Sequence, residues 1–514
     1  MWSTLQVHAT LTAMTNFLWR TLVVFHRYLG IAVGILMLVW FASGIVMMYV
    51  GFPRLTEQER VNALAPIPWQ ACCRVADGLI PDDQQFYRVQ IENLLGVPVL
   101  RLRRPPRPDA VIDLAEGLGV RRFDMADARA IALDTIARTA GPATVASAAT
   151  IDEDQWTVGR YRRDRPLHRF TFDDPERSTV YVSSTSGQVV LRTTSMQRFW
   201  NWLGAIPHWF YLTVLRSDGP LWSETVIWAS ILGTFLTVLG LYLGIAQFRR
   251  GKDGKFSPYR GLFYWHHLSG LVFGIATLTF VVSGLVSMNP WGFLEGRGGA
   301  GETGRLEGPP PAWGEVRASL AAVRTRSPDA MSLTTAPLAG KLFWLATSAD
   351  GTVTRLDASG NAAPLPEQEL AEAAARIVGS NGISERGVLH EEDAYYFSHH
   401  DQVALPVYRI IANDAENTRY YLDPTSGALL RRADSNSRWH RWLFAGLHRL
   451  DFTAWLRTRP AWDIIVITLM LGGLAGSATG LYLGVRRIRS DVVMVFRLLA
   501  GVRHGDAARR VESS

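Results

Sequence analysis

Cysteine and charge are scarce in this sequence. Only two of its 514 residues are cysteine, the neighbours Cys72 and Cys73, and only 19% are Asp, Glu, Lys or Arg. Adjacent cysteines rarely form an unstrained disulfide, so we expect these two to be small side chains on a helix face and assign them no function. The low charge, together with the 48% share of hydrophobic residues, favours a membrane protein.

Charge is absent from four long apolar runs, which cover residues 28–53, 225–248, 268–294 and 464–485. A helix that crosses the hydrocarbon core of a membrane needs about 20 apolar residues, and each run is long enough. The sequence therefore predicts four transmembrane helices. These runs contain no carboxylate or Lys of the kind that ion coupling uses, which disfavours a transporter.

The net charge of +7 comes from basic residues that gather where the predicted helices end. Eight of them flank the second, third and fourth runs: Arg249, Arg250, Lys252, Lys255, Arg260, Arg486, Arg487 and Arg489. This placement is typical of cytoplasmic loops rather than of a nucleic-acid-binding surface. We expect a multi-pass protein of a bacterial inner membrane, surrounded by membrane lipid, with both termini in the cytoplasm and no nucleic acid partner.

The two halves of the chain match each other at a constant shift of 240 residues. FHRYLGIAVG at 25–34 corresponds to WHHLSGLVFG at 265–274, and WLGAIPH at 202–208 corresponds to WLFAGLH at 442–448. Both copies enter the membrane in the same orientation. The sequence thus predicts a tandem duplication, with a pseudo-twofold axis along the membrane normal.

The predicted fold class is an α-helical four-helix transmembrane bundle with two extracytoplasmic α+β domains, each built from two modules of a helix and an antiparallel sheet. The expected order along the chain is membrane helix 15–50, outer domain 51–198, interfacial segment 199–220, membrane helix 221–248, cytoplasmic loop 249–260, membrane helix 261–288, outer domain 289–438, interfacial segment 439–460, membrane helix 461–486 and cytoplasmic tail 487–514.

Local patterns within the outer domains predict several elements. Helix-like stretches cover 69–79, 126–139, 313–324 and 367–378. Four strand endings close on a glycine that suits a turn with positive φ, at Gly117, Gly187, Gly360 and Gly427. The Gly- and Pro-rich run 295–311 predicts a flexible linker.

Four histidines recur at the 240-residue shift: His26, His208, His266 and His448. His26 and His266 begin the first and third spans, near the cytoplasmic face, whereas His208 and His448 precede the second and fourth spans, near the outer face. An imidazole within or beside a span usually has a partner or a ligand.

Two imidazoles at equal depth on symmetry-related helices can serve as the axial ligands of a b-type haem. We hypothesise that His26 pairs with His266 and His208 with His448, because the ligands of one half would lie about 30 Å apart. Small residues beside them would let a flat macrocycle approach the backbone: Gly30, Gly34, Gly270 and Gly274. The alternative is that each histidine lies at the membrane interface without a ligand.

Other polar residues have weaker signals. His267 and His440 are not duplicated, and His168 receives no role. A His- and acid-rich segment could bind a metal ion, but its spacing matches no defined site and a solvated loop is favoured: His390, Glu391, Glu392, Asp393, His399, His400 and Asp401. Ser43–Gly44, Ser283–Gly284 and the LYLG motifs at 241–244 and 481–484 predict helix packing and an interfacial Tyr.

With these motifs the chain resembles the PepSY-associated transmembrane proteins, a family that includes bacterial inner-membrane ferric-siderophore reductases. Two further runs look like PepSY modules, PLHRFTFDDPERSTVYVSSTSG at 166–187 and PVYRIIANDAENTRYYLDPTSG at 406–427. The resemblance implies two b-type haems held by the four repeated histidines, and electron transfer across the inner membrane to a periplasmic ferric siderophore or other ferric chelate.

The resemblance has two points of departure. Some relatives carry a cytoplasmic flavin reductase module, and the stretch after Arg489 is too short for one, so we expect a quinol or a separate reductase as electron donor. Pro207 stands where the second copy has Leu447, which leaves the geometry of His208 open. The competing hypothesis is a non-enzymatic membrane anchor whose outer modules bind peptide or cell-wall material or regulate a protease.

Overall fold

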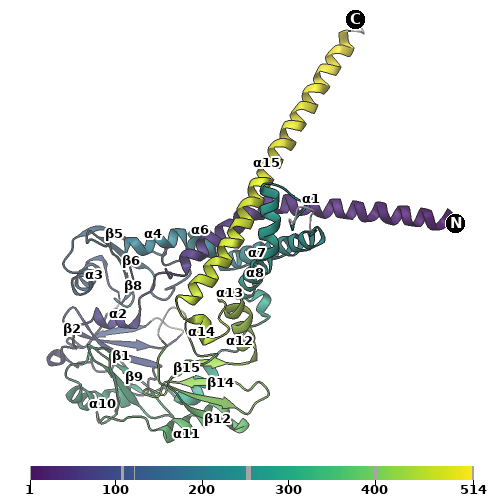
Figure 1. Cartoon of the computed structure of the whole chain (residues 1–514). Coiled ribbons are helices and arrows are strands. Elements are labelled where there is room, and N and C mark those ends of the chain that lie inside the picture. Colours follow the sequence, from purple (N-terminus) through teal and green to yellow (C-terminus); the bar gives the residue numbers. More distant parts are fainter. Residues whose placement is uncertain (1, 106–108, 121, 250–255, 399–402, 512–514) are drawn as a thin grey trace. The chain divides into compact units, whose positions relative to one another are not determined.

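The computed structural model describes residues 2–105, 109–120, 122–249, 256–398 and 403–511. The chain divides into two compact units, whose elements are labelled in Figure 1. The helical unit comprises Met1–Val50, Trp202–Phe293 and His440–Ser514, and the sheet unit comprises Gly51–Asn201 and Leu294–Trp439.

Four long helices form the helical unit: α1 (Trp2–Met47), α7 (Gly219–Ala246), α8 (Leu262–Ser287) and α15 (Ala461–Val511). Each contains a stretch long and apolar enough to cross a membrane, namely Phe17–Met47, Gly219–Ala246, Leu262–Ser287 and Ala461–Met494. The four predicted apolar helices are therefore confirmed. Helix α15 continues well beyond its apolar stretch, so the described part of the predicted tail is helical.

These helices close into a bundle, since α1 and α8 each pack against both α7 and α15. Phe41 of α1 and Phe280 of α8 meet across the centre with ring centroids 6.3 Å apart. Apolar side chains such as Met37, Val281 and Met470 complete a buried core. Short helices connect the bundle to the rest of the chain: α4 (Ser195–Leu203), α5 (Ala205–Trp209), α6 (Thr213–Arg216), η2 (Pro290–Gly292), α12 (Ser435–His440), the π-helical η4 (Arg441–Gly446), α13 (Leu447–Arg449) and α14 (Ala454–Arg457).

The sheet unit contains three antiparallel sheets among its described residues. The largest has the order β11-β10-β9-β1-β2-β3-β4, with β1 (Arg88–Leu94), β2 (Val97–Arg103), β3 (Ala110–Asp113), β4 (Leu118–Val120), β9 (Ser332–Thr335), β10 (Phe343–Thr347) and β11 (Val353–Asp357). Strand β1 pairs with β9, so this one sheet contains strands from both segments that the sequence analysis treats as separate outer domains.

The other two sheets have four strands each and repeat the same order. One consists of β5 (Val145–Ile151), β6 (Leu167–Phe172), β7 (Thr179–Ser183) and β8 (Val189–Thr193); the other consists of β12 (Ile383–Leu389), β13 (Val407–Ala412), β14 (Arg419–Leu422) and β15 (Leu429–Ala433). Both have a register shift between their first two strands and another between their last two.

Helices cover these sheets: α2 (Glu57–Asn62), α3 (Met125–Thr139), α9 (Ala300–Glu307), α10 (Trp313–Arg326) and α11 (Glu367–Val378), with the 3-10 turns η1 (Trp69–Ala71) and η3 (Gly379–Asn381). Helix α3 packs on β6 and β7, and α11 packs on β12 and β13. The fully buried Trp313 of α10 lies in a core with Trp344 of β10. Membrane helices combined with α+β regions thus agree with the predicted class.

Most of the local predictions hold. The helices predicted at 126–139, 313–324 and 367–378 are α3, α10 and α11. The four turn glycines have positive φ, at Gly117 (79°), Gly187 (66°), Gly360 (78°) and Gly427 (78°).

Three local predictions are wrong. Residues 69–79 form only the short turn η1, because the backbone N–H groups of Arg74 and Ala76 bond the carbonyls of Leu114 and Gly117 instead of continuing a helix. Cys72 and Cys73 form a disulfide rather than part of a helix face. The run 295–311 is not a flexible linker, because it contains α9, whose Leu306 is fully buried in a core with Leu338 and Ile377.

Candidate functional site: two pairs of histidines

The four repeated histidines come together as two pairs in the helical unit. The rings of His26 on α1 and His266 on α8 have centroids 6.4 Å apart and planes inclined by 41°. The rings of His208 on α5 and His448 on α13 have centroids 6.2 Å apart and planes inclined by 68°. His208 contacts Ser43, which follows His26 along α1 by about 25 Å of helix axis, so the two pairs are separate sites.

Both rings of the His208–His448 pair are held by their Nδ1 atoms. Nδ1 of His208 lies 3.1 Å from the Trp40 carbonyl oxygen and 3.1 Å from Ser43 Oγ. Nδ1 of His448 lies 3.2 Å from the Phe280 carbonyl oxygen and 3.0 Å from Ser283 Oγ. A carbonyl oxygen only accepts, so Nδ1 carries the hydrogen and donates it.

The other ring nitrogen of each of these histidines is therefore free for a ligand. Burial lowers the pKa of both His208 and His448, and the rings are neutral. In a neutral imidazole whose Nδ1 carries the hydrogen, Nε2 keeps its lone pair. In a metal-binding histidine, the ring nitrogen that does not bind the metal usually donates a hydrogen bond of this kind, which fixes the orientation of the ring.

The two rings of the His26–His266 pair differ in the hydrogen bonds of their Nδ1 atoms. Nδ1 of His266 lies 3.1 Å from the Gly476 carbonyl oxygen and 3.4 Å from Thr479 Oγ1. Nδ1 of His26 is buried without a hydrogen-bond partner, although the carbonyl of Leu236, the residue that corresponds to Gly476, lies close to this ring. Position 239 is Leu where position 479 is Thr, which removes one acceptor from the first half.

A glycine of a neighbouring helix faces each ring. A Cβ atom added to Gly240 or Gly480 would lie 2.8 Å from Cε1 of His26 or His266. At Gly44 and Gly284 it would lie 3.3 Å and 3.8 Å from Cε1 of His208 and His448. Only the absence of a side chain lets the rings of His26 and His266 lie where they do.

Sequence reasoning missed these supporting residues. It assigned Ser43–Gly44 and Ser283–Gly284 to helix packing, whereas their hydroxyls contact the histidines. The only available signal was their recurrence at the same shift as the histidines. The glycines predicted to let a macrocycle approach the backbone have different surroundings. A Cβ atom added to Gly270 would meet nothing within 4 Å, whereas one added to Gly274 would lie 2.5 Å from Leu241.

Pro207 does not alter the placement of His208. In both halves the segment ends on a residue in the left-handed region, Phe210 (φ 54°) and Leu450 (φ 55°). In both halves an indole N–H also donates to the carbonyl of the residue after the histidine, from Trp222 at 2.7 Å and from Trp462 at 2.6 Å. The same contacts therefore fix His208 and His448 despite the different residue before them.

A buried ion cluster lies beside the second pair in the second half only. Asp451 is fully buried and contacts the guanidinium groups of Arg441 at 3.1 Å and Arg457 at 3.2 Å. The corresponding residues of the first half are the uncharged Asn201, Tyr211 and Ser217. These ion pairs hold together the segment that contains His448.

The remaining histidines have structural surroundings. Both ring nitrogens of His267 are engaged, by Ser257 at 2.7 Å and the Gly244 carbonyl at 2.8 Å. His168 is engaged likewise by Thr150 and the Phe123 carbonyl. His440 is half-buried and its ring packs against Phe444.

The acid-rich segment contributes no metal site within the described chain. His390, Glu391 and Glu392 are exposed, while His399, His400 and Asp401 lie outside the described residues. No group of three or more His, Cys, Asp or Glu side chains arranged to hold a metal ion occurs among the described residues.

The geometry of the two pairs fits axial ligation of a haem iron. A bond between a metal and an imidazole nitrogen is about 2 Å long and the nitrogen lies about 1 Å from the ring centre, so two rings on one metal have centroids roughly 6 Å apart. The separations of 6.4 Å and 6.2 Å match this spacing, and the identity of the group that the rings hold stays a prediction.

Fold and site define a multi-pass membrane protein with histidines paired between facing helices. The model of the PepSY-associated TM region matches residues 23–375, and the chain belongs to this family. No curated protein matches the chain significantly.

Proposed function

We propose that this protein transfers electrons across a bacterial inner membrane through two b-type haems and reduces a ferric siderophore or another ferric chelate on the outer side. His26 and His266 would hold one haem, and His208 and His448 the other. The observation that carries the proposal is the spacing of the two ring pairs, 6.4 Å and 6.2 Å, with Nε2 left for a ligand wherever Nδ1 is bonded. A haem bound at each pair would supply one-electron oxidation and reduction.

The protein's own residues have two tasks in this proposal. The carbonyls of Trp40 and Phe280 and the hydroxyls of Ser43 and Ser283 fix the rings and direct Nε2 away from the backbone. Along α1, Val33 and Met37 lie between His26 and Ser43, and both are buried in the apolar core of the bundle. An apolar interior of this kind keeps an electron path separate from the movement of ions.

Further parts of the proposal rest on the sequence. The basic residues after α7 and within α15 favour a cytoplasmic location for that side and for both termini. A quinol or a separate reductase would then donate electrons to the His26–His266 site. We also infer that the chain arose by tandem duplication, since hydrogen bonds recur at a shift of 240 residues around His208 and His448 and again at Trp222 and Trp462.

The test is the colour of the purified full-length protein. The expected preparation is red, with a reducible b-type spectrum and two haems per chain. His26→Ala and His448→Ala should each remove one of the two, whereas His440→Ala, on a histidine outside both pairs, should leave both in place.

Two outcomes would overturn the proposal. A colourless preparation would favour the non-enzymatic anchor, and unchanged haem content in both alanine variants would sink the ligand assignment. The chelate part is tested separately, by mixing the dithionite-reduced protein anaerobically with ferric chelates and recording haem reoxidation.

A further inference from the structure

An arginine without a carboxylate partner lies beside the second pair of histidines. Arg449 directly follows His448 on α13, and its guanidinium carbon lies 5.4 Å from the centre of the Phe444 ring. That ring lies 5.4 Å from the ring of His448, with the two planes inclined by 34°. Twice 5.4 Å, or 10.8 Å, is therefore the greatest possible distance between the Arg449 guanidinium carbon and the centre of the imidazole.

The backbone of Arg449 is fixed, and its side chain remains available. Trp462 donates to its carbonyl oxygen at 2.6 Å, and the next residue, Leu450, lies in the left-handed region with a φ of 55°. The Arg449 side chain is half-buried, and within the described ranges its guanidinium forms no hydrogen bond and no ion pair. A guanidinium is always charged and has five N–H donors, so this one can bind an anionic ligand.

Two other arginines of this segment share one carboxylate. Arg441 and Arg457 contact the fully buried Asp451 at 3.1 Å and 3.2 Å. Together with Arg449 they make three guanidinium groups for one carboxylate, an excess of two positive charges. Charges in a protein interior act on one another more strongly than charges in water, because the effective dielectric constant is lower. The segment around His448 therefore favours a ligand with negative charge.

The first half does not repeat this arrangement. The residues at the four corresponding positions are uncharged at neutral pH: Asn201, Trp209, Tyr211 and Ser217. The segment has one arginine of its own, Arg216, whose guanidinium carbon lies over the rings of Trp222 at 4.3 Å and Tyr211 at 5.2 Å. Two aromatic faces thus already engage the charge of Arg216. A ligand with carboxylates along one edge would be bound in one orientation, with that edge toward the second half.

We propose that Arg449 binds a propionate of the haem that the proposed function, on which this inference rests, assigns to His208 and His448. Haem b has two propionate carboxylates on one edge, and the charge excess beside His448 matches them in number. A guanidinium suits a carboxylate because its parallel N–H groups can donate to both oxygens. Arg449 is therefore a positioning residue, which fixes the orientation of the haem between the two rings.

The charge of Arg449 also affects the iron. Without this guanidinium the negative charge of the propionate would remain uncompensated, which stabilises ferric iron relative to ferrous iron and lowers the midpoint potential. The inference thus predicts an effect on the haem of the second pair alone, since the other pair is a separate site.

The first test measures this midpoint potential by redox titration. In a His26→Ala background, which should keep only the haem of the second pair, Arg449→Gln should lower the potential by about 59 mV, the value for a tenfold change in a one-electron equilibrium. Arg449→Lys keeps the charge and should restore most of the potential. Arg216→Gln is the matched control from the first half and should leave the potential unchanged.

The second test separates a contact with the propionate from a general weakening of the site. The His26→Ala protein is loaded with haem or with haem dimethyl ester, in which both propionates are esterified, and release to excess apomyoglobin is timed. The ester should leave at least tenfold faster than haem. In Arg449→Gln this ratio should fall below threefold, whereas a merely structural role would speed both releases alike and keep the ratio.

The outcomes distinguish this inference from the proposed function. An unchanged potential in Arg449→Gln, an equal fall in Arg216→Gln or an unchanged release ratio would overturn the inference and leave the proposed function intact. Equal release of haem and its ester by the parent protein would overturn it without any variant at position 449. A colourless full-length protein would overturn both.

Discussion

The first and second halves of the chain hold one pair of histidines alike and the other pair differently. His208 and His448 each contact one serine hydroxyl and one backbone carbonyl at 3.0 to 3.2 Å. Of His26 and His266, only His266 has such partners. The two halves also differ in the sheet unit: in the first, α2, α3 and β8 line a cleft, whereas in the second, α9 packs against α11 and β15.

Features that the two halves share are candidates for a role in ligand binding, and features of one half alone are candidates for a role in stability. Features present in both halves are the four histidines and the glycines that face them. Features present in the second half are Thr479, the Asp451 cluster and the packing of α9 against α11 and β15. Substitutions at matched positions can therefore test which of these features decide ligand binding and which decide stability.

The largest effect is expected from a methyl group placed against a histidine of the first pair. Gly240→Ala and Gly480→Ala each bring a Cβ atom to within 2.8 Å of an imidazole carbon, so the ring must move. Overpacking of this kind costs about 1–3 kcal/mol, and haem at the His26–His266 site should fall in both variants. The haem content per chain measures the loss of haem, and the thermal unfolding midpoint measures the loss of stability.

Gly219→Ala is the matched control for these variants. It makes the same change at the start of the apolar helix α7, but its Cβ would lie 3.7 Å from Arg216, an ordinary contact. Full haem content in Gly480→Ala would show that the close approach of this glycine does not position His266.

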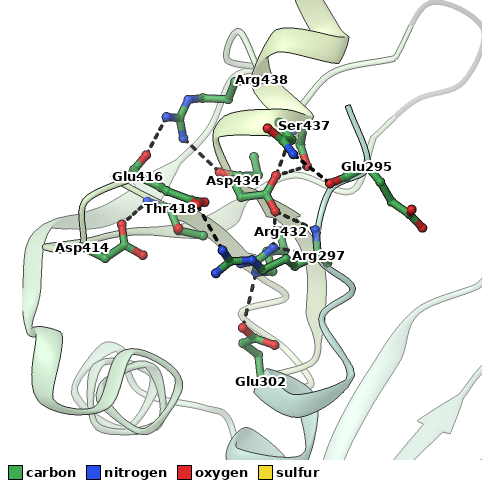
Figure 2. Close-up of polar contacts among 12 residues, drawn as sticks. Glu295, Arg297, Glu302, Asp414, Glu416, Thr418, Arg432, Asp434, Ser437 and Arg438 are labelled. Atoms are coloured by element: carbon green, nitrogen blue, oxygen red, sulfur yellow. Dashed lines mark hydrogen bonds and ion pairs between the residues drawn. The ribbon is translucent and has the colours of Figure 1, made fainter. Parts of the chain in front are cut away.

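A smaller effect is expected at Asp434, which corresponds to Thr194. Burial by itself would raise the pKa of Asp434, but hydrogen bonds from Ser437, from the Arg297 backbone and from Arg432 outweigh it and lower the pKa to about 2 (Figure 2). A carboxylate with a lowered pKa stabilises the fold above about pH 4 and loses this contribution as the pH falls toward 2.

Asp434→Asn should therefore lower the free energy of unfolding by about 2 kcal/mol at pH 7 and flatten its dependence on pH between about 4 and 2. Denaturant unfolding followed by tryptophan fluorescence measures both. Thr194→Ser, at the position without an ionisable group, should leave the pH dependence as in wild type. An unchanged acid limb in Asp434→Asn would contradict the role assigned to this carboxylate.

An effect near 1 kcal/mol is expected from the serines of the second pair. Ser43→Ala and Ser283→Ala remove one acceptor from His208 or His448 while the backbone carbonyl remains, so each should weaken haem retention by about 1 kcal/mol. The two variants should weaken haem retention to the same extent, because His208 and His448 have matching hydrogen-bond partners. Ser287→Ala is the control, since its hydroxyl bonds the Gly284 carbonyl rather than a histidine. Haem dissociation rates would reveal unequal effects if the halves differ here.

The smallest effect is expected from exchanging Leu239 and Thr479, the two matched residues of which only Thr479 offers a hydroxyl to its histidine. Leu239→Thr should give Nδ1 of His26 the acceptor that Thr479 gives His266, and Thr479→Leu should remove it. The distance of 3.4 Å indicates a weak bond, so each change should shift haem affinity by no more than about 1 kcal/mol, in opposite directions. Shifts of the same sign would show that hydrogen bonding to Nδ1 does not distinguish the halves.

Much of the helical unit could be predicted from local patterns. Four charge-free runs identify four apolar helices because the apolar requirement of a membrane acts on each segment separately. The 240-residue shift identified the histidines, and the turn glycines followed from the conformational need for positive φ.

Contacts between distant segments could not be predicted in this way. Residues 69–79 have a helix-like pattern, but their N–H groups bond the segment after β3. The run 295–311 has the composition of a linker, but Leu306 finds a core assembled from β13, β14 and α11. The pairing of β1 with β9 joins strands about 240 residues apart, and no local signal announces it.

The sequence by itself determined which residues enter the membrane and which histidines repeat, because hydropathy and repetition are properties of the chain alone. Only the tertiary structure decided that Ser43 reaches His208, that Gly480 makes room for His266 and that α2, α3 and β8 line a cleft. These features depend on side chains meeting across helices and sheets, and the positions of those elements result from packing the whole unit.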